Sequence, residues 1–465
     1  MKSSRLSVDR GSCPRILPAR VHRRAVAVRP AGCAAIVLVV ATFFAASAHA
    51  AVDVSAVERF RPALPVIPNR TFVLTDFGAV ADGATLNTAA FNRAIAAVDQ
   101  AGGGTLLVPK GVYLTGPFVL CSSLDLHLAE GAVIKAPETF AALGIPEPNT
   151  LRSQDEVNAR VKVPEPFISG TNLHDVALTG TGTVDGSGAH WWAWSERAAR
   201  QRAHSEPGRL VYPRPHLVVI DSCQRVQVAD VTLTNSSKFH LVPRDITDLT
   251  IERVKVRAPF DAPNTDAIDP GPGRNFWIHD CDIDTGDDDI VIKRGGANIL
   301  IESCTIKHGH GISIGSGTDI GISTMLVRNC TFDGTDNGIR IKSMRGAGGL
   351  VENIRYTGIR MKSVDHAIVL DLTYVDNNRP DFKGDPAKTP VLRDVLIDHV
   401  VIEGARHAGR IIGLPDSRIT RITLRDVRIT AEEDLVIKDA DPPAYEKVTR
   451  DIRKGVAPAK VKVVE

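Results

Sequence analysis

Four short polar motifs lie between Asn264 and Lys342, and they hold the residues of this chain that could perform acid–base chemistry. Aligned on Ile268, Ile290, Ile312 and Ile339, they place Asp266, Asp288 and His310 in one column, at steps of 22 residues from 266 to 288 and from 288 to 310. A constant step predicts stacked coils that gather these side chains on one face, with Asp287 beside them. Clustered carboxyl groups are what acid–base cleavage of a glycosidic bond requires. The motifs are Asn264-Thr265-Asp266, Gly286-Asp287-Asp288, Gly309-His310-Gly311 and Arg340-Ile341-Lys342.

The run of aspartates after Gly286 leaves open which carboxyl groups face a site. Strict strand alternation would send Asp287 and Asp288 to opposite faces, so both can act only from the turn that enters the strand. Gly286 permits such a turn. The spacing alone does not choose between Asp287, Asp288 and Asp289. Runs of Asp and Gly between strands are usually turn residues, so it is the coincidence of four motifs on adjacent coils that favours catalysis.

Basic residues accompany the acids on the same strand face. Lys293, Arg340 and Lys342 share its outward parity. An arginine can bind a carboxylate through two parallel hydrogen bonds, and a lysine adds a point charge. The pattern therefore suits a polymeric anion that carries carboxylate groups.

A short repeat organises the chain from Val228 onward, with the pattern apolar-x-x-(Val/Cys/Ile)-x-apolar. Self-similarity at this period indicates a solenoid, and alternation within each copy indicates short strands rather than helices. We therefore predict an all-β fold, a right-handed parallel β-helix. A leucine-rich repeat fits poorly, because its fixed leucine and asparagine pattern is absent. The fourth positions of the copies are 231, 254, 281, 304, 330, 359, 400 and 427.

The cysteines and one helical segment complete this architecture. Cys281, Cys304 and Cys330 occupy one column whose parity points inward, which predicts a packed ladder of thiols. The chain has no CxxC motif, so zinc is not expected. The one clear helical pattern, about residues 85–100, predicts an N-terminal capping helix for the solenoid.

The first 50 residues have the pattern of an export signal. A basic region precedes the apolar stretch from Ala31 to Ala46, and Ala48-His49-Ala50 matches a small-x-small cleavage site. The alternative is a membrane anchor, for which the apolar run is short. We expect a secreted protein, extracellular or periplasmic, cleaved near Ala50, with no membrane contact in the mature form.

The mature chain, residues 51–465, is expected to form a single catalytic domain with a loose tail at 440–465. Taking the 8 basic and 1 acidic residues of the leader from 56 and 54 leaves 48 and 53, a formal net charge of −5. The value of +2 for the whole chain is therefore no argument for nucleic acid binding, and none is expected.

Taken in order, the four motifs resemble those of the polygalacturonases, glycoside hydrolase family 28. The resemblance covers roughly residues 70–430, and the stretch from Gly334 to Tyr374 resembles the bacterial endo-acting members in particular. One departure is Asp289, where relatives more often carry Cys or Asn. Membership implies hydrolysis of α-1,4-galacturonosyl bonds in pectin or polygalacturonate, with inversion and endo action, and without metal or organic cofactor. Separately, we expect a monomer.

The resemblance also implies a role for each site residue. Asp287 would be the general acid, while Asp266 and Asp288 would hold and deprotonate the attacking water. His310 would tune the protonation of the acid.

The substrate-binding residues follow from the same resemblance. Arg340 and Lys342 would bind a galacturonate carboxylate, and Tyr374 would contact the sugar at the bond to be cut. Asn264 would border the site as a supporting polar residue.

Several alternatives stay open at this point. An exo-polygalacturonase and a rhamnogalacturonan hydrolase would use the same fold, and so would a calcium-dependent pectate lyase. A non-catalytic adhesin or polysaccharide-binding β-helix would not need aligned acids and bases.

Overall fold

The computed structural model describes residues 52–203, 208–375, 384–385 and 387–453. The leader expected at 1–50, its cleavage site near Ala50, and the end of the tail at 454–465 lie outside the described residues. Across the described ranges, no helix is long and apolar enough to cross a membrane.

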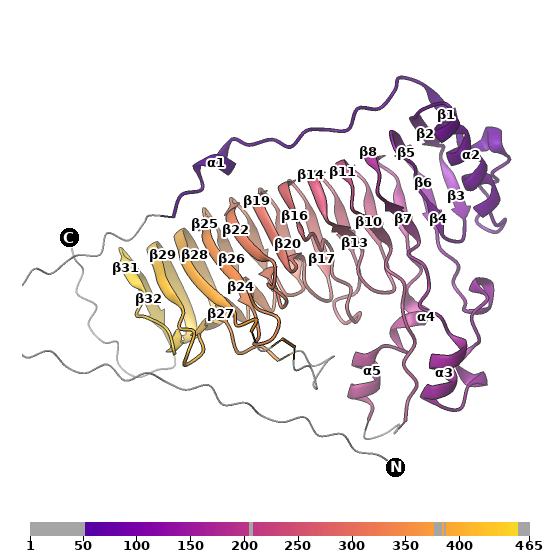
Figure 1. Ribbon diagram of the computed structural model, residues 1–465. Helices are drawn as coiled ribbons and strands as arrows, with labels where there is room; N and C mark the ends of the chain where they lie inside the picture. Colours follow the sequence, from indigo (N-terminus) through magenta and orange to yellow (C-terminus); the bar gives the residue numbers. More distant parts are fainter. Residues whose placement is uncertain (1–51, 204–207, 376–383, 386, 454–465) are drawn as a thin grey trace, which may run out of the picture. The chain divides into compact units, whose positions relative to one another are not determined.

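The chain folds into a right-handed parallel β-helix, as predicted, in which each coil adds short strands to three stacked rows (Figure 1). Each strand pairs in parallel with the strand one coil away, as β19 pairs with β22. The first row consists of β1 (Thr71–Val73), β2 (Gly104–Val108), β5 (Leu124–Leu128), β8 (His174–Gly180), β11 (Gln224–Ala229), β14 (Ile246–Glu252), β16 (Gly273–His279), β19 (Gly295–Glu302), β22 (Gly321–Arg328), β25 (Leu350–Thr357), β28 (Val391–Ile412), β29 (Thr420–Glu433) and β31 (Ala444–Glu446).

The second row follows each first-row strand after a short turn. The long strands β28 and β29 belong to this row as well, because they continue through the turn. The other strands of this row are β3 (Gly111–Leu114), β6 (Ala132–Lys135), β9 (Thr183–Asp185), β12 (Thr232–Thr234), β15 (Lys255–Arg257), β17 (Asp282–Thr285), β20 (Thr305–His308), β23 (Thr331–Asp333), β26 (Arg360–Lys362) and β32 (Thr449–Ile452).

The third row carries the candidate site. Ile268 bridges its two halves, since it pairs with Leu241 on one side and with Ile290 on the other. Because the strands are in register, residues 22 to 27 apart in the sequence become neighbours across one coil spacing of about 4.8 Å. The strands of this row are β4 (Phe118–Val119), β7 (Ile168–Thr171), β10 (Val218–Asp221), β13 (Leu241–Arg244), β18 (Ile290–Ile292), β21 (Ile312–Ile314), β24 (Asn337–Lys342), β27 (His366–Asp371), the end of β28, and β30 (Val436–Lys438).

The core is the interior of the coils, filled by stacked apolar side chains. The residues at the fourth positions of the repeat are all buried there, so this column of the repeat does point into the core. Burying one such aliphatic side chain contributes roughly 1.5–3 kcal/mol, and each coil supplies several. Cys281, Cys304 and Cys330 are buried in one column as free thiols, which confirms the thiol ladder.

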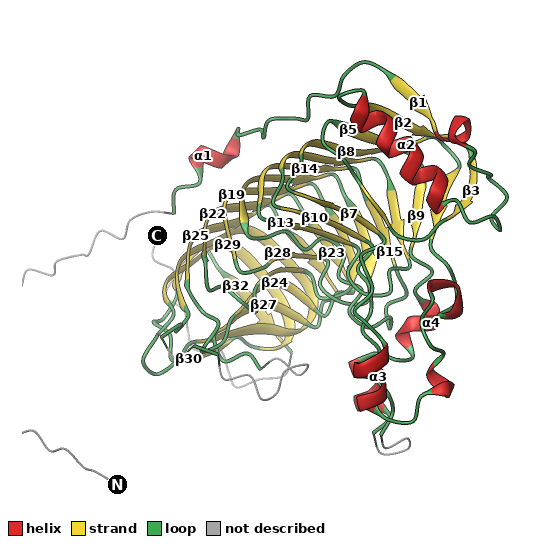
Figure 2. Ribbon diagram, turned by 45° about the vertical axis from the view of Figure 1, so that its right-hand side comes forward, coloured by secondary structure: helices red, strands yellow, loops and turns green. Residues whose placement is uncertain are grey.

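Helix α2 (Thr88–Gln100) is the predicted N-terminal cap, and Figure 2 shows it beside the first strands of the stack. Its buried stripe includes Phe91, Ile95 and Val98. The Phe91 ring stacks on Phe118 of β4 at 4.6 Å between centroids. Apolar surface at the end of the first coil is thereby withdrawn from water.

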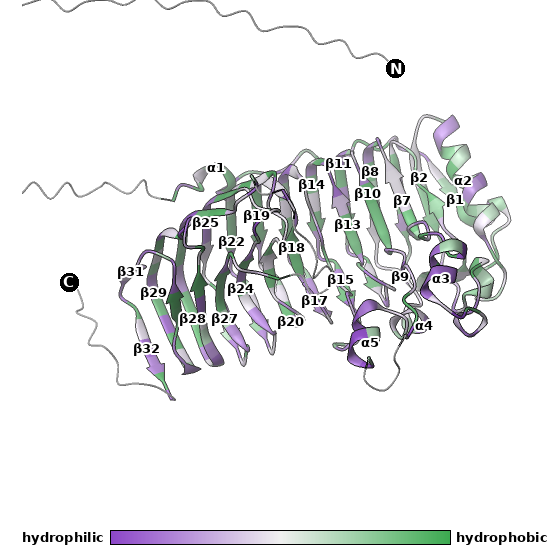
Figure 3. Ribbon diagram, turned by 60° about the horizontal axis from the view of Figure 1, so that its bottom comes forward, coloured by the Kyte–Doolittle hydropathy of each residue, from purple (hydrophilic) through white to green (hydrophobic). Residues whose placement is uncertain are grey.

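Two segments leave the stack and together form a helical insert that the repeat pattern did not predict, one between β6 and β7 and the other between β9 and β10. It holds α3 (Gln154–Arg160), α4 (Ala189–Trp192) and α5 (Glu196–Gln201), and Figure 3 shows strongly hydrophilic colour on α5. The helices are too short for a periodic signal, which explains the miss. The insert has its own apolar cluster of Phe140, Leu151, Val157, Val161, Trp191, Leu210 and Tyr212.

Helix α1 and the strands past residue 440 lie at the two ends of the described chain. Helix α1 (Ser55–Glu58) packs Val57 against Leu300 and Leu326, on the outer surface of the first row. Past residue 440 the chain continues the coils, because β31 and β32 both pair with β29. The segment expected to be a loose tail, 440–465, therefore contains two short strands before the described residues end at 453. The described residues also contain three short 3-10 helices, η1 (Leu74–Phe77), η2 (Ala141–Leu143) and η3 (Pro148–Thr150).

Candidate active site

The predicted column of site residues exists in the structure. Ile290 pairs with Ile268 on one side and with Ile312 on the other, and Ile312 pairs with Ile339. All four isoleucines are fully buried, so the residues two places before them meet at the edge of the third row. All eight predicted site residues line one cleft there, namely Asn264, Asp266, Asp287, Asp288, His310, Arg340, Lys342 and Tyr374.

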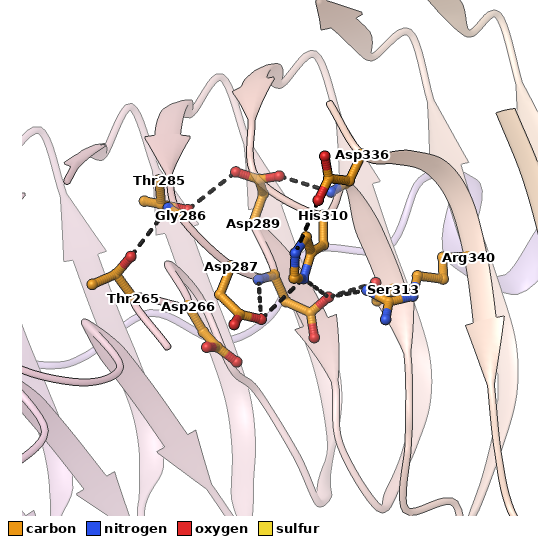
Figure 4. A network of polar contacts seen from close by, with 12 residues as sticks. Thr265, Asp266, Thr285, Gly286, Asp287, Asp289, His310, Ser313, Asp336 and Arg340 are labelled. Atoms are coloured by element: carbon orange, nitrogen blue, oxygen red, sulfur yellow. Dashed lines mark hydrogen bonds and ion pairs between the residues drawn. The ribbon is translucent and has the colours of Figure 1, made fainter. Parts of the chain in front are cut away.

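The aspartate run lies in the bend before β18, which is the condition that both Asp287 and Asp288 needed to face the cleft. Gly286 is required at the start of this bend, because a Cβ atom there would lie 2.4 Å from the Ala262 carbonyl oxygen. Asp289 points into the coil instead. It accepts hydrogen bonds from the Gly311 amide (2.8 Å) and the Thr285 hydroxyl (3.2 Å), and Figure 4 shows it turned away from Asp287.

Asp288 is the most heavily paired acid of the cleft. Lys342 Nζ lies 2.7 Å from Oδ2, while Arg340 Nη1 (2.8 Å) and Ser313 Oγ (3.0 Å) both donate to Oδ1. Burial would raise the pKa of Asp288, but the Lys342 and Arg340 charges outweigh it and hold the pKa well below its usual range. This carboxylate is therefore ionised across the physiological pH range.

Asp287 and His310 form a pair that shares one proton. His310 Nδ1 lies 3.1 Å from Asp287 Oδ1, and its Nε2 lies 3.2 Å from Asp336 Oδ2. Burial disfavours the imidazolium, yet the two flanking carboxylates outweigh burial and raise the pKa of His310 to about 10. Burial likewise opposes ionisation of Asp287, but the His310 charge and hydrogen bond bring the pKa of Asp287 below its usual value. The two shifts together favour an imidazolium at His310 paired with an ionised Asp287.

Asp266 differs from its neighbours because one of its oxygens has no protein donor. Lys293 Nζ donates to Oδ2 at 2.8 Å, whereas the buried Oδ1 accepts no hydrogen bond from the described residues. Burial raises the pKa of Asp266 to about 6, with Lys293 opposing that rise and Asp287 and Asp288 adding to it. Near neutral pH this oxygen is a free, ionised acceptor for a water molecule.

The Lys293 ammonium also contacts Asp269 and the ring of Phe239. It donates to the buried Asp269 as well as to Asp266. Its ammonium lies 3.9 Å from the centre of the Phe239 ring, a cation–π distance. Lysine 293 therefore connects the coil of Asp266 to the following coil.

Asn264 and Tyr374 also line the cleft. Asn264 Oδ1 accepts a hydrogen bond of 2.7 Å from Arg214 Nη2. The Tyr374 ring centre lies 5.4 Å from Lys342 Nζ. Both side chains are half-buried and are held beside charged partners.

The cleft has further lining residues that sequence reasoning missed. The spacing pattern could not place Arg197 and Arg200, because α5 approaches the cleft only through tertiary packing. Phe239 lies two places before Leu241, so the aligned column could have identified it. The missed lining residues are Arg197, Arg200, Phe239, Gly315 and Ser316.

Among the described residues, two groups of side chains have donor atoms close enough to hold a metal ion. Asp287, Asp288 and His310 form one, with all donor atoms within 4.8 Å. Asp288 already forms ion pairs with Arg340 and Lys342, and the raised pKa of His310 favours its positively charged form. These three positive charges would repel a metal ion at this position. The other group, Asp365, His366 and His407, lies two coils further along the same row.

Comparison with known proteins gives consistent matches. The model of a family described as glycosyl hydrolases family 28 matches residues 104–441. A probable polygalacturonase of Vitis vinifera is 33% identical over 375 residues, covering 77% of this chain and 73% of that protein. An endo-polygalacturonase of Pectobacterium carotovorum is 28% identical over 345 residues, covering 71% and 80%. Three other plant relatives are covered over only 56 to 60% of their own length.

Among solved structures, the chain is similar to a hyperthermoactive exopolygalacturonase from Thermotoga maritima. The TM-score is 0.70 at 27% sequence identity, and the match covers 84% of this chain and 94% of that one.

Proposed function

The chain belongs to glycosyl hydrolase family 28 and is a glycoside hydrolase, and on that premise we propose that it hydrolyses α-1,4-galacturonosyl bonds of polygalacturonate, the unesterified form of pectin. The single observation that carries the proposal is the composition of the cleft. Acids that can donate and accept protons lie directly beside Arg340, Lys342 and Lys293. Such a cleft attracts a polymer of carboxylate-bearing sugars and can cleave it.

The proposed mechanism begins with protonation of the leaving oxygen by the Asp287–His310 pair. In the unliganded site the proton resides on His310 Nδ1, 3.1 Å from Asp287 Oδ1. A bound polyanion displaces water and makes the Asp287 carboxylate harder to keep ionised, so the proton moves to Asp287. Asp287 then donates it to the glycosidic oxygen as the bond breaks.

The attacking water is held on the other side of the scissile bond. Asp288 is kept ionised by Arg340 and Lys342, and Asp266 offers the unoccupied Oδ1. These two carboxylates orient the water and accept its proton. Attack opposite the leaving group inverts the anomeric carbon.

Arg340 and Lys342 have two roles in this proposal. They pair with Asp288 in the free site, and they contact a substrate carboxylate at the edge that faces the cleft. The Tyr374 ring, next to Lys342, borders the same sugar. No step requires a metal ion or an organic cofactor.

Endo action is the proposed mode, by similarity to the Pectobacterium endo-polygalacturonase. Exo action is a second candidate, because the structural match to the Thermotoga exopolygalacturonase covers 94% of that chain. A product-size time course on polygalacturonate separates them. Endo cleavage shortens the average chain early, whereas exo cleavage releases small products from the first minutes.

The site of action is part of the proposal. We infer secretion from the leader pattern at 1–50, which suits an enzyme whose polymeric substrate lies outside the cell. The mature enzyme is proposed to act as a monomer.

The test of the function is a reducing-sugar assay on polygalacturonate, with Asp287→Asn as the inactive control. New reducing ends without ultraviolet absorbance support the hydrolase. Unsaturated products would identify a lyase, and binding without cleavage would identify a polysaccharide-binding β-helix. Activity confined to rhamnogalacturonan would move the substrate to that polymer.

A further inference from the structure

Two arginines of the cleft come from outside the solenoid. Arg197 and Arg200 lie on α5, three positions apart and so on one face of that helix. Both line the cleft that contains Asp266, Asp287 and Asp288. The remaining charged residues of the cleft all come from the turns and strands of the third row.

These arginines differ from the other cations of the cleft in their pairing. Arg340 and Lys342 are paired with Asp288, and Lys293 is paired with Asp266 and Asp269. Within the described ranges, neither Arg197 nor Arg200 takes part in a hydrogen bond or an ion pair. Their guanidinium groups are therefore available to an anion that enters the cleft.

The helix that carries the arginines is fixed to the catalytic turn by Arg214. The Arg214 side chain is 1% exposed, and its Nη2 donates both to Glu196 Oε2 of α5 (3.2 Å) and to Asn264 Oδ1 (2.7 Å). Its Nη1 donates to the carbonyl oxygens of Ser237 (2.9 Å) and Pro263 (2.7 Å). A buried guanidinium with this many acceptors has one permitted position, so α5 is placed relative to Asn264 before substrate binds.

Local packing also holds the start of α5. The buried Ser195 caps the helix, its Oγ accepting a hydrogen bond of 3.1 Å from the Ala198 amide. Next to it, the Trp194 ring packs near Tyr212, with 6.1 Å between centroids. The arginines thus stand on a supported helix rather than on a free loop.

We propose that Arg197 and Arg200 form a second carboxylate-binding subsite, for a galacturonate unit other than the one that Arg340 and Lys342 contact. The proposal rests on the proposed function, since polygalacturonate carries a carboxylate on every unit. Two guanidinium groups three positions apart on one helix face match one planar carboxylate through charge-assisted hydrogen bonds. A methyl ester removes the charge, so this subsite makes the enzyme prefer unesterified stretches.

The test uses the full-length enzyme with Arg197→Gln and Arg200→Gln combined. We expect KM for polygalacturonate to rise about tenfold or more, the effect of losing a charge-assisted hydrogen bond. The value of kcat should stay within about twofold, because neither residue touches the reacting atoms. The salt dependence of KM should become weaker.

Two controls separate charge recognition from a structural effect. The combination of Arg274→Gln and Arg428→Gln removes two exposed arginines from the outer surfaces of β16 and β29, and it should leave KM unchanged. The charge-preserving pair Arg197→Lys and Arg200→Lys should restore part of the affinity. On highly methyl-esterified pectin the glutamine pair should behave as the wild type.

The possible results of this test distinguish a failure of the proposed function from a failure of the proposed subsite. A wild type without activity on polygalacturonate would overturn the proposed function itself. An active wild type whose glutamine variant keeps the wild-type KM would overturn only the subsite. An equal rise of KM on esterified and unesterified substrates would also overturn it, because that result would indicate a disturbed helix rather than a lost carboxylate contact.

Discussion

Lys342 Nζ lies 2.7 Å from Asp288 Oδ2 although the two residues are 54 positions apart in the sequence. The solenoid register makes this contact, because the two coils between these residues have steps of 22 and 27 positions, from Ile290 to Ile312 and from Ile312 to Ile339. The Lys342 side chain is 8% exposed and Asp288 is 3% exposed. One buried contact therefore joins the cation proposed to bind substrate to a carboxylate proposed to act in catalysis, and neither group can be changed without affecting the other.

Removal of the catalytic carboxylates should separate catalysis from stability. Each of Asp266→Asn, Asp287→Asn and Asp288→Asn is expected to reduce kcat about 10²–10⁴-fold, the usual contribution of general acid or base catalysis. Asp288→Asn should in addition lower the melting temperature, since breaking a buried ion pair typically costs about 3–5 kcal/mol. Reducing-sugar kinetics and thermal unfolding measure the two effects. Near-normal turnover by Asp287→Asn would refute the assignment of the acid.

Removal of the basic residues should weaken substrate binding. Arg340→Ala and Lys342→Ala are expected to raise KM for polygalacturonate, and added salt should weaken the affinity that is left. Each change also removes a charge that keeps the pKa of Asp288 low, so kcat should fall at acidic pH. Michaelis constants equal to those of the wild type in both variants would rule out carboxylate recognition by this pair.

The column of site residues could be predicted because it depends on a local and regular feature. A buried isoleucine recurs once per coil, and the polar residue two places before it must then emerge at the same edge of the row. The inward thiols of Cys281, Cys304 and Cys330 followed from the same parity. Periodicity thus indicated the fold class and the shared edge of Asp266, Asp288 and His310, whereas Tyr374 was named only through the resemblance to a known family.

Contacts outside the repeat could not be predicted in the same way. Arg197 and Arg200 reach the cleft only because Arg214, buried in the folded chain, ties α5 to Asn264. The direction of Asp289 was also undetermined, since a bend does not obey strand alternation. Its inward position depends on the Gly311 amide, which belongs to the next coil.

The pH profile should report on Asp266. Burial raises the pKa of Asp266 to about 6, so as a base it is active above that pH and protonated below it. We expect kcat/KM to fall as the pH drops through about 6. Lys293→Met removes a charge that lowers this pKa, so the acidic limb should move to higher pH. Measurement of kcat/KM from pH 4 to 9 for the wild type and Lys293→Met tests this assignment. If the basic limb of the profile moved instead of the acidic limb, Asp266 would be the general acid.

Asp289 should make stability depend on pH. Burial raises the pKa of Asp289 well above the usual value, with the Gly311 amide only partly opposing it. A group whose pKa is raised on folding stabilises the protein below its unfolded pKa, and that stabilisation is lost as the pH rises through the folded pKa. Asp289→Asn should therefore gain more stability over the wild type at pH 8 than at pH 4. Thermal unfolding at both values measures this, and an equal difference at the two would contradict it.

The stereochemistry of the first product tests the mechanism most directly. Asp266 and Asp288 are both assigned to water, so no side chain is left to form a covalent intermediate, and water attacking opposite the leaving group converts the α bond into a β product. Protonation by Asp287 replaces any need for a metal ion at the departing oxygen, so activity should persist in a strong chelator. Proton NMR of the anomeric signals early in digestion, before mutarotation, measures the configuration. An initial α product would mean a covalent intermediate and would reassign all three aspartates. Loss of activity on chelation, together with unsaturated products, would instead identify a calcium-dependent lyase.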